Sequence, residues 1–174
     1  LWAGRICMCG EGEALNLILP KKFLTGEKIN DSIKFSKGEF KEKNYFLNPD
    51  SERFNFYLNE LRENKRVLML LPTHQQAKNF FERLPEDLKL NALLWPSSNY
   101  KYWDSWKIAH EKKIRIIVAS PAGIFAPLMP EKFIIEDEAS PYYILPYKIN
   151  LEKYFHHLLI NQHWDSMILS QIKF

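Results

Sequence analysis

The sequence contains few of the residues that mark several specialised classes of protein. Only two of its 174 residues are cysteines, Cys7 and Cys9, and only six are glycines. A Cys-x-Cys pair offers at most two metal ligands, and no histidine lies nearby to complete a tetrahedral set. The two cysteines are therefore expected to be reduced thiols and not a metal site.

Long apolar segments are also absent. The longest run without charge, Ile116 to Pro130, is shorter than a bilayer span and is broken by Pro121 and Pro127. No basic segment followed by an apolar one marks a signal peptide. The sequence therefore predicts a soluble, cytoplasmic protein with no membrane partner.

A strong excess of one charge is missing as well. The formal net charge is only +3, and basic and acidic residues alternate along the chain instead of forming blocks. Composition alone therefore gives no electrostatic argument for binding to nucleic acid or to anionic lipid. The residues that are plentiful are apolar: 46% of the chain is hydrophobic and 14% aromatic, enough for one core of ordinary size.

The first 43 residues differ in pattern from the rest. Residues 1–20 carry a short helical pattern that ends at Pro20, typical of the end of another module. Residues 21–43 are rich in Lys, Glu, Ser and Gly and have no sustained period, which indicates a linker. The apolar run "SMILSQIKF" at the other end predicts a strand with nothing after it, so we expect the chain to be a fragment of something longer.

From Asn44 onward, apolar segments alternate with helical patterns. The run "RVLMLLP" is apolar throughout, which is typical of a strand buried on both faces of a parallel sheet. The next helix should turn Ala77, Phe80, Phe81 and Leu84 inward. Strands are expected at 44–47, 66–72, 91–95, 114–120, 133–137 and 166–170, and further helices at 48–64, 102–111 and 151–159. This alternation predicts an α/β fold with a parallel sheet and right-handed crossovers.

The segment "FIIEDEAS", residues 133–140, holds the clearest chemical signal. It is an apolar strand that runs into the acidic pair Asp137 and Glu138. Ligands of open parallel sheets lie beyond the carboxyl ends of the strands. In nucleotide hydrolases, an Asp at that place holds the magnesium ion that bridges two phosphates, and a neighbouring Glu can orient the attacking water. An Asp-Glu pair alone is a weak signal, because it occurs by chance in many proteins.

The order of motifs around this pair is more specific. The segment "YWDSWKIAHEKKIRIIVASPAGIFAPLMPEKFIIEDEASPYY" resembles the first motor domain of the primosomal protein N-prime (PriA) family of bacterial replication-restart helicases. The resemblance rests on Tyr102, Trp106, the turn 119–123, Phe125-Ala126-Pro127 and the acidic segment 137–140. "VLMLLP" with Thr73 resembles the motif after the nucleotide loop, and "SMILSQ" stands where the family has its Ser-Ala-Thr motif. The opening "LWAGRICMCGEGEALNLILP" resembles the tail of the family's winged-helix module.

The resemblance implies a fold and a set of roles. Residues 44–174 would form a RecA-like parallel sheet flanked by helices, of the P-loop NTPase helicase type, preceded by the remnant of a winged helix. Asp137 would bind Mg²⁺ and Glu138 would position water for hydrolysis of ATP. Thr73, His74, Ser120 and Pro121 would line the side that faces single-stranded DNA, through backbone and hydroxyl contacts to phosphate. Forked or single-stranded DNA and replication-restart proteins would be the partners.

The sequence departs from the family at the phosphate-binding loop. The family has Gly-x-x-x-x-Gly-Lys-Ser/Thr between the first strand and the first helix, whereas this chain has "YFLNPDSERF", without glycine or lysine. Ser51 and Arg53 could be remnants of the loop's hydroxyl and cation that contact nucleotide. The alternative is an ordinary surface helix start, since Asn-Pro-Asp-Ser is a capping sequence. Asp50 and Glu52 would repel a triphosphate.

Three functions remain open on the sequence. The first is a PriA-like restart protein, or a piece of one, that binds branched DNA and has lost ATP hydrolysis. The second is an active DNA-dependent ATPase that uses Asp137 and Glu138. The third is a structural or assembly domain that binds neither nucleotide nor DNA. Trp103 and Trp106, three apart on one helix, are expected to belong to the core and not to a base-stacking platform.

Overall fold

The computed structural model describes residues 22, 25, 44–45, 50–97, 102–111, 114–128, 130–137, 140–145, 149–150 and 165–169. The predicted winged-helix tail, residues 1–20, lies outside the described residues. So do the predicted helix 151–159 and, apart from Lys22 and Thr25, the linker.

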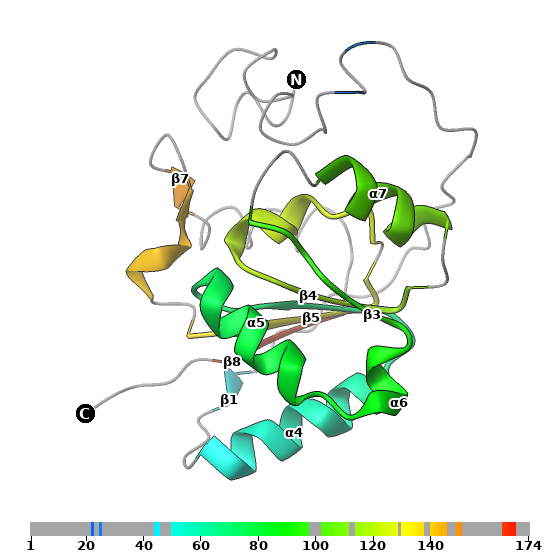
Figure 1. Ribbon diagram of the computed structural model, residues 1–174. Helices are drawn as coiled ribbons and strands as arrows, with labels where there is room; N and C mark the ends of the chain where they lie inside the picture. The colour runs from blue at the N-terminus through cyan, green and yellow to red at the C-terminus, as the bar shows by residue number, and fades with distance from the viewer. Residues whose placement is uncertain are drawn as a thin grey trace.

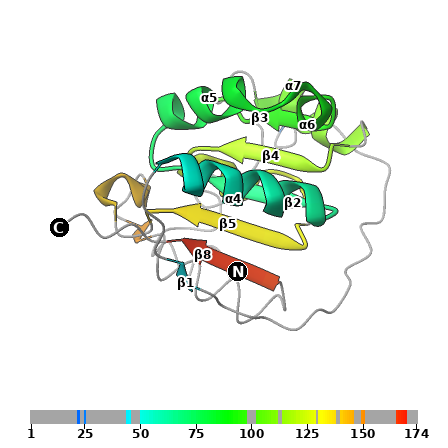
Figure 2. The same cartoon turned by 90° about the horizontal axis from the view of Figure 1, so that it is seen from below.

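The centre of the fold is a six-stranded sheet in which every neighbouring pair of strands is parallel. Its order is β1-β8-β5-β2-β4-β3, and Figure 2 shows the strands side by side in that order. The strands are β1 (Asn44–Tyr45), β2 (Val67–Leu70), β3 (Ala92–Leu94), β4 (Ile116–Ala119), β5 (Lys132–Glu136) and β8 (Asp165–Leu169). A separate antiparallel pair is formed by β6 (Ile144–Leu145) and β7 (Ile149–Asn150). The predicted α/β class with a parallel sheet is confirmed.

Helices lie on both sides of this sheet (Figure 1). One side carries α4 (Asp50–Glu63), α5 (His74–Arg83) and the single turn α6 (Glu86–Lys89). The other side carries α7 (Tyr102–Glu111) and the 3₁₀ helix η2 (Pro121–Phe125). A second 3₁₀ turn, η3 (Pro141–Tyr143), follows β5. The predicted helix 102–111 has the same bounds in the structure as α7. The predicted helix 48–64 corresponds to α4, which the structure describes from Asp50 to Glu63.

Strand β2 shows why the sequence needs both layers. All four of its residues are buried, and successive side chains of a strand point to opposite faces. Leu68 and Leu70 pack with the α7 side, whereas Val67 and Met69 pack with the α4 and α5 side. The prediction of a strand buried on both faces is confirmed.

The helices bury the stripes that their periodicity predicts. Ala77, Phe80 and Leu84 are buried in the hydrophobic cluster on the α4 and α5 side of the sheet. Phe81 is half-buried and packs against that cluster. On the other side, Trp103 is 8% exposed and Trp106 is half-buried against the core. Both tryptophans therefore lie in or against the core, as the sequence predicts.

The connections of β2 and β5 mark the place where a site is expected. After β2 the chain passes through α5 and α6 toward β3 at one edge, whereas after β5 it continues to β8 on the other side. Adjacent parallel strands whose connections leave in opposite directions form a crevice at their carboxyl ends, where open α/β sheets bind ligands. The crevice between β2 and β5 is the topological switch point of this fold.

Candidate functional site at the carboxyl edge of the sheet

The sheet brings most of the predicted site residues to one edge. Leu70, the last residue of β2, pairs with Ala119 of β4 and with Ile135 of β5. Thr73 and His74 follow β2, Ser120 and Pro121 follow β4, and Asp137 follows β5. These segments, distant in the sequence, therefore end at the same level of three neighbouring strands.

Thr73 is the N-cap of α5. Its hydroxyl oxygen accepts a hydrogen bond from the Gln76 backbone N–H at 3.2 Å, and the hydroxyl donates to Gln76 Oε1 at 2.8 Å. The Thr-x-x-Gln spacing is that of a capping box. His74 is half-buried, and its covered Nδ1 has no hydrogen-bond partner among the described residues. Thr73 thus has a structural role that accounts for its presence at this position.

Ser120 and Pro121 are more deeply covered. Ser120 is only 9% exposed, and its carbonyl accepts a hydrogen bond from the Gly123 N–H at 2.8 Å. Pro121 is buried at the first position of η2. Of the four residues assigned to DNA by resemblance, only Thr73 and His74 therefore reach the surface in part.

Asp137 lies immediately after β5 in an unusual backbone conformation. Its φ angle is +52°, in the left-handed region that Asp tolerates better than most residues. Its carbonyl accepts a hydrogen bond from the Ser140 N–H at 2.8 Å, which begins the turn into η3. The prediction that the strand reaches Asp137 is wrong by one residue, because the chain turns there and β5 ends at Glu136. Glu138 lies outside the described residues.

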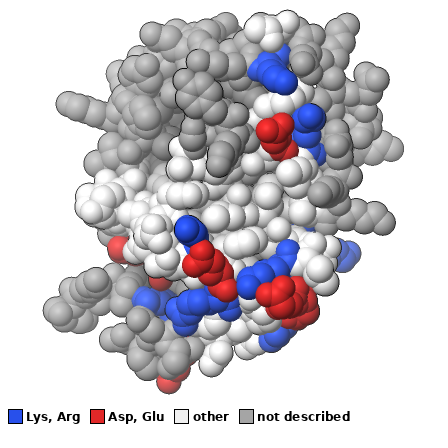
Figure 3. Space-filling view, in the orientation of Figure 1, with Lys and Arg blue, Asp and Glu red and all other residues white. Residues whose placement is uncertain are grey.

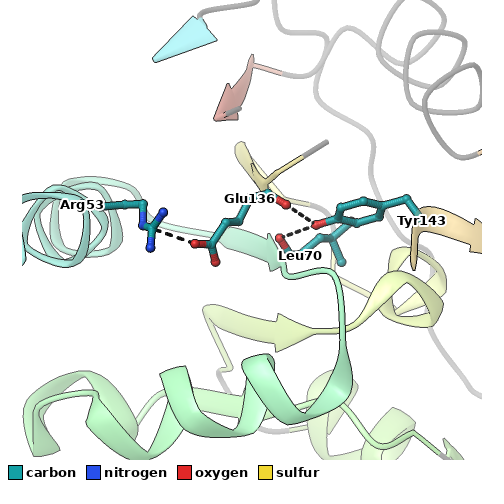
Figure 4. A network of polar contacts seen from close by, with 4 residues as sticks. All are labelled: Arg53, Leu70, Glu136 and Tyr143. Carbon is teal, nitrogen blue, oxygen red and sulfur yellow. Dashed lines mark hydrogen bonds and ion pairs between the residues drawn. The ribbon is translucent and has the colours of Figure 1, made fainter. Parts of the chain in front are cut away.

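Arg53 and Glu136 form an ion pair across this edge (Figure 4). Arg53 Nε lies 3.3 Å from Glu136 Oε1, and the two side chains are only 17% and 15% exposed. Ser51 lies in the first turn of the same helix, α4. The Arg53 side chain leaves the start of α4 toward the sheet, where it meets the end of β5.

Tyr143 joins the carboxyl ends of β2 and β5. Its hydroxyl lies 2.7 Å from the Glu136 carbonyl oxygen and 3.0 Å from the Leu70 carbonyl oxygen, so two acceptors share one proton (Figure 4). Tyr143 is 3% exposed. One wall of the crevice at the switch point is therefore filled by a side chain of the protein.

The opposite wall, between α4 and α5, is hollow. A pocket of about 180 Å³ opens there, which we call the α4–α5 pocket. It is lined by Arg53, Phe54, Tyr57, Leu71, Gln76, Asn79, Phe80, Arg83 and Glu136. Sequence analysis missed Glu136, Tyr57 and Tyr143. The acidic end of the strand was the available signal for Glu136. Tyr57 lies on the apolar face of α4, so in the sequence it could not be distinguished from an ordinary core residue.

Tyr57 combines deep burial with a polar group. The residue is 2% exposed, and its hydroxyl has no hydrogen-bond partner among the described residues. Burial raises the pKa of the Tyr57 phenol well above its usual range, and the nearby Glu136 carboxylate raises it further, against a smaller lowering by Arg53. The phenol is therefore a neutral hydrogen-bond donor at physiological pH.

Magnesium and ATP, implied by the resemblance, can be compared with these residues. Magnesium is commonly held by one or two carboxylates together with water and phosphate, so Asp137 alone is an acceptable protein ligand. The start of α4 does not fit a triphosphate, because the Arg53 guanidinium pairs with Glu136.

Within the described ranges, no three His, Cys, Asp or Glu side chains gather as metal ligands. In the same part of the chain, no helix has the length and apolar character needed to cross a membrane. Family models give no match to the sequence, and a search of curated proteins gives none. The fold itself defines the class: a parallel α/β domain with helices on both faces and a polar site at the carboxyl edge.

Proposed function

We propose that the chain is a RecA-like domain related to the first motor domain of the PriA family, and that this chain acts in the cytoplasm in replication restart. In this proposal it binds single-stranded or forked DNA at the carboxyl edge of its sheet and does not hydrolyse ATP. Replication-restart proteins would be its partners.

The arrangement of three segments supports the relationship. β1, which leads into α4, and β5, which ends beside Asp137, are separated in the sheet by β8 alone. β8 contains "SMIL", the segment that resembles the strand of the family's Ser-Ala-Thr motif. The three segments that stand where the family has its phosphate-binding loop, its acidic motif and its Ser-Ala-Thr motif are thus neighbours in the sheet, which is what a shared ancestral site would require.

The observation that carries the loss of ATP hydrolysis is the ion pair between Arg53 and Glu136. In a phosphate-binding site, the cation at the start of the first helix must face the phosphates. Here the nearest cation of α4 neutralises a carboxylate one residue before Asp137. A phosphate that used Arg53 as its cation would have to displace Glu136 from it, at the cost of leaving a partly buried carboxylate without its partner.

The surface supports a particular mode of DNA contact. Among the described residues on the face in Figure 3, lysines and arginines lie beside acidic residues and form no continuous basic stripe. Contacts to phosphate would then come mainly from the partly exposed groups after β2, the His74 side chain above all, because Ser120 and Pro121 after β4 are buried and the Thr73 hydroxyl is bonded to Gln76. Such contacts position a strand without reading its sequence.

Calorimetric titration with ATP and magnesium tests the proposed loss of the nucleotide site. We expect no binding to the wild-type chain or to Asp137→Asn. Binding by the wild-type chain that is lost in Asp137→Asn would instead support an active ATPase and would reject the loss of the nucleotide site.

Fluorescence anisotropy with labelled forked and single-stranded oligonucleotides tests the proposed DNA binding. We expect binding that weakens as salt rises, because phosphate contacts release counterions. His74→Ala should weaken it roughly threefold to tenfold by loss of one or two contacts, whereas the neighbouring exposed variant Gln75→Ala should not. Absence of both ATP and DNA binding would leave an assembly domain as the function.

A further inference from the structure

The α4–α5 pocket lies beside the switch point on the α4 and α5 side of the sheet, whereas the predicted DNA residues after β4 lead into η2 on the α7 side. Its floor is made of buried residues, among them Tyr57, Leu71 and Phe80, and its rim of exposed residues of α5, among them Gln76 and Asn79. This combination of an apolar floor and a polar rim is common in small-molecule sites. Nothing in the proposed DNA binding uses this pocket.

The pocket is small. A cavity of about 150 Å³ is large enough for benzene, and the α4–α5 pocket has a volume of about 180 Å³. It therefore admits one ring with a small substituent or a tetrahedral anion, and it is too small for a whole nucleotide.

Hydrogen-bond donors outnumber acceptors around it. Gln76 Oε1 accepts from the Thr73 hydroxyl, and Asn79 Oδ1 accepts from Gln75 Nε2 at 2.8 Å, so both amides keep their NH₂ groups as donors. The Arg83 guanidinium carbon lies 4.2 Å above the Phe54 ring centre, which holds that cation at the rim. The single lining carboxylate, Glu136, is offset by Arg53.

Tyr57 gives an independent indication of a ligand. A buried hydroxyl without a partner is costly, and native structures rarely keep one without a reason. The Tyr57 hydroxyl is such a group among the described residues, and its residue lines the pocket. As a neutral phenol it donates one hydrogen bond, so its missing partner is an acceptor.

We propose that the α4–α5 pocket binds a small oxyanion, a carboxylate or phosphate group carried on no more than one ring. Tyr57 donates to one oxygen of the anion from the floor. Arg83 and the amide of Asn79 meet the other oxygens at the rim, and the face of Phe80 packs against any ring. This site goes beyond the proposed function and does not depend on it.

Titration of the full chain by calorimetry at constant ionic strength tests the proposal, with benzoate and inorganic phosphate as probes. We expect a dissociation constant of about 1 mM or lower for at least one probe. Tyr57→Phe and Arg83→Gln should each raise it about tenfold, the loss of one hydrogen bond to a charged group. Lys78→Gln removes the same charge as Arg83→Gln from the same helix but outside the pocket, and it should leave the constant unchanged.

Each outcome of this titration either supports or overturns the proposed oxyanion site. Preference for benzoate identifies a carboxylate ligand, and preference for phosphate identifies a phosphate ligand; either supports the site. No binding of either probe, or equal weakening by Lys78→Gln and Arg83→Gln, would overturn it. Because Tyr57→Phe removes an unpartnered buried hydroxyl, its thermal midpoint should not fall, so weaker binding in that variant is not a consequence of unfolding. DNA binding in the assay above is expected to persist in Tyr57→Phe, which keeps this test apart from the proposed function.

Discussion

At the scale of single residues, the ion pair between Arg53 and Glu136 sets the balance of charge at the carboxyl edge of the sheet. Both side chains are largely covered, so each charge has lost most of its hydration. The attraction between them compensates for that loss only while both are present. The pair therefore makes a larger difference to stability than the ion pairs on the surface, which are worth little.

Replacement of either partner should destabilise the fold. We expect Arg53→Gln and Glu136→Gln each to lower the free energy of unfolding by about 2 kcal/mol, because the remaining charge is left partly buried. The double variant should lose less than the sum. Urea unfolding measures all three. The control is Lys78→Gln, whose pair with Glu82 has side chains 51% and 60% exposed, and it should change stability by less than about 0.5 kcal/mol. Equally small effects at Arg53 and Glu136 would show that the pair contributes nothing.

Tyr57 predicts a pH dependence with a definite sign. Its pKa in the folded state is raised above the value of 10.0 that applies to the unfolded chain, mainly by burial. Above about pH 10 the unfolded state loses a proton that the native state keeps, so stability falls as pH rises, by up to about 1.4 kcal/mol per pH unit for this group. Below that pH the contribution is fully present.

Urea unfolding between about pH 9 and pH 11 tests this expectation. Tyr57→Phe should show a shallower decline than the wild-type chain. Burial also raises the pKa of Tyr102, so Tyr102→Phe should reduce the slope in the same direction. Tyr142 is 65% exposed, and Tyr142→Phe is the matched control that should keep the wild-type slope. Identical slopes for Tyr57→Phe and wild type would mean that the phenol ionises as readily in the folded state as in the unfolded chain.

The sequence showed only part of this residue chemistry. The position of Asp137 at the end of an apolar strand was visible, because an apolar run that meets an acidic pair is a local pattern. The partner of Glu136 was not, because Arg53 lies far away in the sequence and meets it only when α4 packs beside β5. The same reason hid Tyr57, whose spacing on α4 resembled that of any core aromatic.

At the scale of elements, periodicity predicted the regular segments well. The continuous apolar runs of β2 and β4 and the helix Tyr102–Glu111 were identified from the sequence. The 3₁₀ helix η2 was expected only as a turn, because five residues are too few for a periodic signal. Its conformation is set by packing instead: Pro121 fixes the first position and Ile124 is buried against the α7 side of the sheet.

Gly123 shows how tightly η2 packs on the sheet. A Cβ atom at this position would overlap the Cβ of Ala119 in β4. We expect Gly123→Ala to lower the free energy of unfolding by about 2 kcal/mol, since η2 must move away from the sheet to accommodate the methyl group. Urea unfolding of the single variant measures this cost.

The double variant provides the control. Ala119→Gly removes the atom that the new methyl group would meet, so Gly123→Ala should cost less in that background than in the wild type, even though Ala119→Gly has its own cost in the strand. Additive effects of the two substitutions would contradict a direct contact between the two positions.

At the scale of the whole molecule, the sequence predicted the class of the sheet but not its order. Alternating strands and helices indicate parallel pairing, yet they do not say which strands become neighbours. That β8 separates β1 from β5 depends on long-range packing. The switch point between β2 and β5, and with it the α4–α5 pocket, follows from that order, so the site had to wait for the structure.

The same order predicts how stability is distributed. β2 is paired on both sides, with β4 and β5, and all of its residues are buried, whereas α6 is a single turn with Leu88 as its buried residue. Amides of β2 should therefore exchange with solvent only on global unfolding, and those of α6 through local opening. Hydrogen exchange followed by mass spectrometry measures both in one experiment, with mild urea as the control: exchange in β2 should accelerate steeply with urea and that in α6 hardly at all, because only global unfolding exposes much surface. Exchange of β2 as early as α6 would contradict a fold whose stability resides in the doubly covered centre of the sheet, the part from which the candidate site is built.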